Sequence, residues 1–209
     1  MTNEQIRRRD LAIIEELIPP HARVLDLGCG NGTFLRTLME NKGIRGLGVE
    51  IEQPLISNCI ANGVNVIQGN LDDPLTFADD DSFDVVVLSH TLQQVKHPDE
   101  LLREIVRVGK RAVVSVINFG YLPCRTKLMF TGRMPETEAI PYHWYDTPNI
   151  HLSTLSDFQN LCNKLGISIV RKIPVGSRHS RWARLAPNLL AQGCVYELEK
   201  RHKKSEDKI

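Results

Sequence analysis

Apolar residues recur along this chain in two alternating patterns, one with the spacing of helices and the other with that of buried strands. The first helical pattern covers residues 3–18, where apolar positions fall on one broad arc before Pro19-Pro20 ends the segment. We therefore predict an amphipathic helix there that covers one face of a sheet.

Helical spacing returns around residues 34–39, 55–60, 101–106 and 153–165, and a shorter helical segment is predicted over 182–190. Runs typical of strands cover 24–27, 46–51, 64–68, 83–89, 112–117, 167–175 and 193–198, the last predicted as an edge strand. Alternating strands and helices predict an α/β fold with a doubly wound, mostly parallel, seven-stranded, Rossmann-like sheet. In such a fold a ligand binds at the carboxyl ends of the strands, near the topological switch.

The first strand ends in a glycine-rich loop, Asp-Leu-Gly-Cys-Gly-Asn-Gly, that runs from Asp26 to Gly32 and leads into a helix. We expect Gly28 and Gly30, with Cys29 between them, to bring free backbone N–H groups close to a ligand. A dinucleotide fingerprint would need a glycine at Thr33, and a P-loop would need a lysine that is absent. The remaining pattern resembles motif I of class I S-adenosylmethionine-dependent methyltransferases, although a tight turn without a ligand is the simpler alternative.

The next two strand ends carry residues that suit a nucleoside. Glu50 follows the glycine loop by about 20 residues, where an acidic side chain can bind a ribose diol. Asn70 and Leu71 follow the third strand. The methyltransferase resemblance implies that they lie against adenine, where the family often has Asp in place of Asn70; an amide oxygen can still accept a hydrogen bond.

The fourth strand leads into Ser89, His90 and Thr91, much as these methyltransferases carry their motif IV. The resemblance implies that this edge faces the reactive methyl group. His90 is then a candidate general base, or a histidine that lines the cofactor without taking part in chemistry.

Residues 118–152 are predicted to form a long loop or lid, because the composition changes after the fifth strand. Three aromatic residues and two histidines gather within residues 142–151, where they form either a pocket wall or partner surface or a packed loop that braces the sheet. Tyr142 and Tyr145 are candidates to face a methyl acceptor. The spacing of the histidines and Asp146 matches no compact metal site, so no metal is expected.

Composition narrows the functional classes. A net charge of +1 over 209 residues gives no field that favours nucleic acid or an anionic membrane, and no apolar run approaches the ~18 residues of a membrane span. Five dispersed cysteines without a Cys-x-x-Cys pair indicate reduced thiols in the cytoplasm. We expect one domain over residues 1–199, followed by a charged, frayed tail over 200–209.

The chain as a whole resembles the MetW family of methionine biosynthesis proteins. The segments that carry the likeness are 24–34, Gly-Val-Asn-Val-Ile at 63–67, Leu-Gln-Gln-Val at 92–95, Asn-Phe-Gly at 118–120, Gly-Arg-Met-Pro at 132–135 and Trp-Tyr-Asp-Thr-Pro-Asn-Ile-His at 144–151. The resemblance implies a class I methyltransferase fold that acts with homoserine O-acetyltransferase in methionine synthesis. It implies no methyl acceptor.

Two hypotheses follow. In one, the chain is an O- or N-methyltransferase with an unidentified small acceptor, and His90, Tyr142 and Tyr145 are its catalytic candidates. In the other, it is a partner subunit that acts through residues 142–151 on the acyltransferase, and bound cofactor reports methionine status through a population shift. Both hypotheses share one set of cofactor-binding residues: Asp26, Gly28, Cys29, Gly30, Glu50, Asn70, Leu71 and Ser89.

Overall fold

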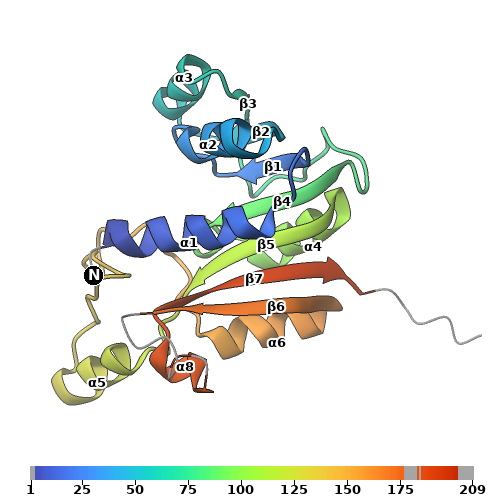
Figure 1. Cartoon of the computed structure of the whole chain (residues 1–209). Coiled ribbons are helices and arrows are strands. Elements are labelled where there is room, and N and C mark those ends of the chain that lie inside the picture. Colours follow the sequence, from blue (N-terminus) through green and yellow to red (C-terminus); the bar gives the residue numbers. More distant parts are fainter. Residues whose placement is uncertain (1–2, 177–182, 184, 202–209) are drawn as a thin grey trace, which may run out of the picture.

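The computed structural model describes residues 3–176, 183 and 185–201 of the chain, which form a twisted sheet with helices on both faces (Figure 1). In chain order the elements are α1 Asn3–Leu17, β1 Arg23–Leu27, α2 Thr33–Lys42, β2 Arg45–Glu50, α3 Gln53–Ala61, β3 Asn65–Gln68, β4 Phe83–Ser89, η1 Leu92–Gln94, α4 Pro98–Val108, β5 Gly109–Ile117, α5 Leu122–Thr131, α6 Leu155–Leu165, β6 Ile167–Val175, α8 Pro187–Leu190 and β7 Gly193–Lys200.

The seven strands lie in the order β3-β2-β1-β4-β5-β7-β6. Strands β1 to β5 pair in parallel, and β7 runs antiparallel to both of its neighbours. The predicted doubly wound, mostly parallel sheet is therefore confirmed. The chain moves outward from β1 through β2 to β3 and then returns to β4 on the other side of β1. The topological switch consequently lies between β1 and β4, and a ligand is expected at their carboxyl ends.

The prediction that residues 193–198 form an edge strand is wrong. Strand β7 lies between β5 and β6, and β6 is the edge. The carboxylate of Glu197 in this strand is buried, and it pairs with Arg111 of β5 at 3.0 Å and with Arg171 of β6 at 3.1 Å. An acid between two cationic neighbours can occupy an inner strand, which the sequence of one strand does not reveal.

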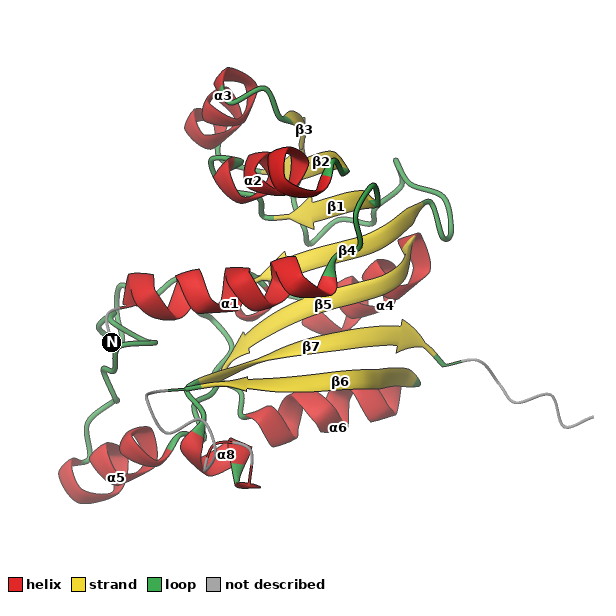
Figure 2. Ribbon diagram, in the orientation of Figure 1, coloured by secondary structure: helices red, strands yellow, loops and turns green. Residues whose placement is uncertain are grey.

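Two hydrophobic layers hold the helices to the sheet. Buried residues of α1, α2 and α3 pack on one face, among them Ile14, Leu35 and Cys59. Buried residues of α4 and α6 pack on the other face, among them Leu102 and Phe158. Figure 2 shows α1 lying over the middle of the sheet, and the predicted role of this helix as a cover for one sheet face is confirmed.

The ends of α6 follow the sequence signals closely. The Thr154 hydroxyl accepts from the backbone N–H of Asp157, and the Asp157 carboxylate accepts from the backbone N–H of Thr154, so the two residues form a capping box. These bonds lower the pKa of Asp157. Gly166 then closes the helix with a left-handed backbone.

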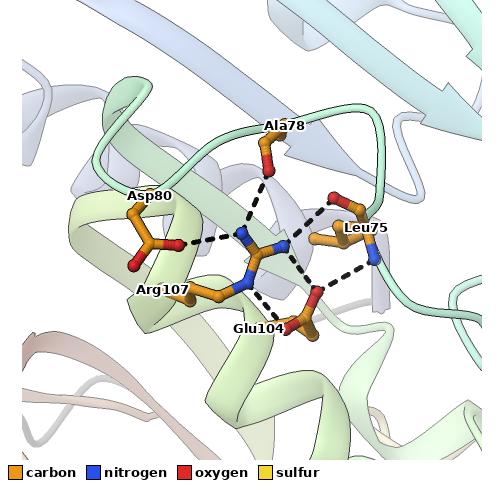
Figure 3. Close-up of polar contacts among 5 residues, drawn as sticks. All are labelled: Leu75, Ala78, Asp80, Glu104 and Arg107. Atoms are coloured by element: carbon orange, nitrogen blue, oxygen red, sulfur yellow. Dashed lines mark hydrogen bonds and ion pairs between the residues drawn. The ribbon is translucent and has the colours of Figure 1, made fainter.

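Arg107 of α4 fixes the long connection between β3 and β4 (Figure 3). Its guanidinium donates to the carbonyl oxygens of Leu75 and Ala78 and pairs with Asp80 and Glu104, while Glu104 also accepts from the Leu75 N–H. Hydrogen bonds with Arg107 lower the pKa of Glu104, and those with Glu104 raise the pKa of Arg107. This connection begins with Gly69 and Asn70, so the network positions one side of the candidate site.

Two other predicted segments differ in detail. Residues 118–152 are not a continuous loop, because 122–131 form helix α5, which begins around Pro123 and ends at Gly132 in a left-handed conformation. Its periodicity was weak because Cys124 is the one residue of the helix that is buried. Lys200 belongs to β7, and the rest of the predicted tail from residue 202 lies outside the described residues, as does part of the segment predicted over 182–190.

Candidate functional site

The glycine loop turns sharply from β1 into α2 on three left-handed residues. Gly28, Gly30 and Gly32 have φ angles of 74°, 59° and 75°. A Cβ atom on Gly28 would lie 2.7 Å from the hydroxyl of Thr91, just after β4. Glycine is therefore required at this position both by the backbone conformation and by the close approach of Thr91.

The loop does not offer the free amides that the sequence suggested, and that expectation is wrong. The N–H groups of Gly28 and Cys29 both donate to the carbonyl oxygen of Val49 in β2, at 2.8 and 3.1 Å. The Gly30 N–H donates to Glu50, and the Gly32 N–H donates to the Cys29 carbonyl oxygen. The loop is thus held by the end of β2, and its shape rather than its amides defines the hollow beside it.

Three cavities meet at Gly28, at the carboxyl ends of the central strands. The largest, of about 530 Å³, lies over the ends of β2 and β3. A second, of about 440 Å³, lies between the glycine loop and α1. The third, of about 210 Å³, lies over the ends of β4 and β5 and continues towards residues 139–149. A single elongated ligand that passes Gly28 can therefore reach all three.

Glu50 lines the largest cavity, and its carboxylate is fixed by backbone groups. One oxygen accepts from the Gly30 N–H at 2.8 Å, and the other accepts from the N–H groups of Ile51 and Glu52 at 2.8 and 3.1 Å. A carboxylate has about four acceptor positions, so one of them is still available to a hydroxyl group. Glu50 thus couples the conformation of the glycine loop to the cavity where we expect a ribose.

Asn70 and Leu71 border the same cavity. Leu71 is half-buried and packs against the core of the α4 face, so it presents an apolar surface that suits a flat ring. The Asn70 amide oxygen accepts from the backbone N–H of Asp72 at 3.0 Å. This is the oxygen that we expect to accept a hydrogen bond from adenine. One of its two lone pairs is used by the Asp72 N–H, and the other is available to adenine.

Asp26, Cys29 and Ser89 line the second cavity, opposite Leu11 and Glu15 of α1. Asp26 is a buried carboxylate at the end of β1, where it can attract a cationic group of a ligand. The Cys29 sulfur lies 3.8 Å from that of Cys59, and burial raises the pKa of the Cys29 thiol. Cys29 therefore contributes a neutral, apolar wall.

His90 lies in the third cavity with a left-handed backbone, φ 57°, which is uncommon for a residue with a side chain. The backbone N–H of His90 donates to the Ser115 hydroxyl at 3.0 Å, and this hydrogen bond holds the conformation. The Nε2 atom of His90 lies 2.8 Å from a carboxylate oxygen of Asp10, a buried residue of α1. Asp10 was not predicted as a site residue, because it lies far from His90 in the sequence and only the fold brings the two together.

The third cavity also contains Tyr142 and Asn149, which both line an adjoining apolar hollow of about 140 Å³. Asn149 is 5% exposed, and its side-chain oxygen is buried without a hydrogen-bond partner among the described residues. Such an atom suits a ligand that donates a hydrogen bond. Tyr145 is not brought to this cavity: it is 70% exposed and stacks on His143, with ring centroids 5.3 Å apart.

Gln93 fastens the long connection after β5 to the sheet. Its side chain bonds both the N–H and the carbonyl oxygen of Ile117 and also the Ser153 hydroxyl, at 2.8, 3.1 and 3.1 Å. Its own carbonyl oxygen accepts from Ile150 and His151. The Leu-Gln-Gln-Val segment was recognised from its family likeness, but its physical role is visible only in these contacts.

Comparison with known proteins identifies the family. The sequence model described as "Methionine biosynthesis protein MetW" matches residues 8–198. The chain belongs to the MetW family. A further relative is the bifunctional methionine biosynthesis protein MetXA/MetW of Rhodopirellula baltica, which is 35% identical over 169 residues, or 77% of this chain and 27% of the relative.

A 2-ketoarginine methyltransferase of Streptomyces arginensis is 32% identical over 117 residues, which cover 50% of this chain and 34% of that protein. The chain thus spans between about a quarter and a third of the length of these two curated relatives. The first match agrees with membership of the MetW family, and the second is to a protein named as a methyltransferase.

Solved structures extend that agreement to the fold. An S-adenosylmethionine-dependent methyltransferase from Archaeoglobus fulgidus superposes with a TM-score of 0.65 at 21% identity, covering 95% of each chain. One from Mesorhizobium loti gives a TM-score of 0.65 at 19% identity, covering 90% of this chain and 95% of that one. Among the helices that the structure describes, none combines the length and the apolar run that crossing a bilayer requires.

Proposed function

We propose that this chain binds S-adenosylmethionine around Gly28 and acts with a homoserine O-acetyltransferase in methionine synthesis. The observation that carries the cofactor proposal is the meeting of three cavities at Gly28, where an added Cβ would enter the space of Thr91. The cofactor has three linked parts, a nucleoside, a sulfonium centre and an amino-acid tail, and the three cavities provide space for such a molecule in an extended form.

The residues present suit each part. Glu50 has an acceptor position for a ribose hydroxyl, and Leu71 with Asn70 borders the space for adenine. Asp26 supplies negative charge for the ammonium group of the amino-acid tail. It lines the second cavity together with Gly28, Cys29 and Ser89. When bound, S-adenosylmethionine supplies an electrophilic methyl group on a positively charged sulfur, and that group would lie towards His90.

The partner proposal rests on the family and on the bifunctional relative, whose name joins MetXA to MetW in one protein. We propose that a separate homoserine O-acetyltransferase is the corresponding partner of this chain. Occupancy of the cofactor site would then report methionine status to the acyltransferase through a shift between conformations. All five cysteines are buried and free, which suits the reducing cytoplasm that we propose as its compartment.

Calorimetry with S-adenosylmethionine and S-adenosylhomocysteine tests the cofactor site. We expect Gly28→Ala to weaken binding of both ligands by at least about 10-fold, because the methyl group collides with Thr91 at the junction of the cavities. Gly132→Ala is the matched control: its φ of 62° imposes similar backbone strain, but nothing lies within 4 Å of the added atom. Absence of binding by the wild-type chain, or equal binding by both variants, contradicts the site.

The acyltransferase assay tests the partner. The rate of purified homoserine O-acetyltransferase is measured with and without this chain, and with S-adenosylmethionine over a range of concentrations. We expect a complex and a changed rate. An unchanged rate together with no detectable complex contradicts the proposed partnership and leaves the cofactor proposal standing.

A further inference from the structure

Helix α5 is the least supported element of the fold. It extends beyond the sheet at the lower left of Figure 1, and within the described chain it makes no extensive contact with another helix or strand. Cys124 is its one buried residue, whereas Met129 and Phe130 are 71% and 77% exposed, and Leu128 is half exposed. A helix of ten residues is marginally stable on its own in water. The described elements around α5 add little stabilisation to it.

A second group of exposed aromatic residues belongs to the same surface. Trp144 is 74% exposed and packs edge-on against Tyr145, with ring centroids 5.7 Å apart. Glu136 links this group to α5, because its two carboxylate oxygens lie 4.0 Å from the Lys127 ammonium group and 3.4 Å from the His143 ring. The helix and the aromatic group are therefore adjacent parts of one face.

We propose that this docking face, formed by Leu128, Met129, Phe130, Trp144 and Tyr145, binds the homoserine O-acetyltransferase subunit. The inference rests on the partnership proposed above, and it adds the surface through which that partnership operates. Exposed aromatic and methionine side chains are enriched in protein interfaces, and Trp and Tyr often contribute most of their binding energy. The relative that unites MetXA and MetW indicates which partner covers the face.

The charges around the docking face are of both signs. Arg125, Lys127 and Arg133 lie in or just after α5, whereas Glu136 pairs with Lys127 and Asp146 follows Tyr145 in the chain. Because these opposite charges offset one another, the apolar and aromatic side chains are expected to dominate binding of the partner.

The docking face also adjoins the cofactor site. The apolar hollow beneath Trp144 shares Tyr142 and Asn149 with the cavity that contains His90. Among the described residues the side-chain oxygen of Asn149 has no hydrogen-bond partner, and a ligand that binds it would act on residues directly behind the face. This continuity provides a route by which the occupied site alters acyltransferase binding.

The test uses the full chain and purified homoserine O-acetyltransferase. The docking variant Met129→Asp/Phe130→Asp and the milder Phe130→Ser are compared with Ile60→Asp, a control at the 66% exposed Ile60 of α3, at the opposite end of the molecule in Figure 1. Binding is measured by interferometry and light scattering, and folding by thermal melts. We expect the double variant to weaken the complex by at least about 30-fold, and the control to bind as the wild type does.

The possible failures are distinguishable. A complex of unchanged affinity with the double variant overturns the docking face but leaves the partnership intact. No complex with the wild type overturns the partnership and the docking face together. If the wild type alone is a dimer that the double variant dissociates, while acyltransferase binding is unaffected, the face belongs to a second copy of this chain and the proposal is overturned. If the double variant has a lowered melting temperature, the affinity of the milder Phe130→Ser variant for the acyltransferase tests the docking face instead.

Discussion

The two long connections of this fold are stabilised in opposite ways. The connection over residues 69–82 contains no helix or strand, yet Arg107 and Glu104 bind it at several points. The connection over residues 118–154 has a helix of its own, but it is fixed at its base by Gln93 and Asn118 while its apolar outer part is exposed. A loop without a core can be ordered by a few buried polar anchors, whereas an exposed apolar segment points to a surface that a partner covers.

Removing the anchor at the base of the second connection should have the largest effect on the stability of the chain. Gln93→Leu leaves the buried N–H and carbonyl oxygen of Ile117 without partners, and we expect it to reduce the free energy of unfolding by about 2–4 kcal/mol. Urea denaturation measures this value. Gln94→Leu is the neighbouring control, since Gln94 is exposed, and its cost should stay below about 1 kcal/mol. Equal costs would show that Gln93 is not an anchor.

Removing the anchor of the first connection should have a smaller effect. Arg107→Met deletes the bonds to Leu75 and Ala78 and leaves Glu104 without its cationic partner, for an expected loss of about 1–3 kcal/mol. Hydrogen exchange should also speed up over residues 70–82. Arg103→Met, one turn earlier on α4, removes only an exposed pair with Asp99 and should cost less than about 0.5 kcal/mol.

The start of β4, where the first connection ends, should make stability depend on pH. Hydrogen bonds from Arg23 and Lys110 hold the pKa of Asp84 well below its ordinary value of 3.8. Because the folded-state pKa is the lower one, this stabilisation is present above pH 3.8 and is lost as the pH falls through the folded-state pKa.

We therefore expect Asp84→Asn to cost about 1–2 kcal/mol at pH 7 and progressively less below about pH 4, as measured by denaturation at each pH. Arg23→Met removes the main cause of the lowered pKa and should flatten the same dependence. A constant difference between the wild type and Asp84→Asn across this range would contradict the assignment.

The smallest effect is expected at the tip of the second connection. Phe130→Ser replaces an exposed ring and should change the stability of the isolated chain by no more than about 0.5 kcal/mol. In the complex with the acyltransferase, the same variant should lower the melting temperature of the assembly. A large loss of stability in the isolated chain would show that Phe130 is part of the core rather than of the docking face.

The sequence predicted features that depend on neighbouring residues. The capping box of Thr154 and Asp157, the position of Glu50 at the end of β2 and the turn at the three glycines all follow from short-range patterns, and the structure contains each of them. Their physical causes lie within a few residues along the chain, so no knowledge of the fold was required.

The failures depend on distant partners. Strand β7 is internal rather than an edge strand, and its buried Glu197 depends on Arg111 and Arg171 of the strands on either side. Asp10 becomes part of the site only when α1 crosses the end of β4, and the amides of the glycine loop are occupied only because β2 ends beside them. Helix α5 lacks a buried stripe, which removes the pattern by which a helix is recognised in sequence.

The burial of every cysteine has a practical consequence for following the protein in solution. Burial raises the pKa of all five thiols, to about 12 for Cys162 and Cys194, so none is a ready nucleophile at neutral pH. A single cysteine introduced on the outer surface would therefore react selectively with maleimide dyes. Fluorescence could then report the approach of another molecule without first removing any native sulfur.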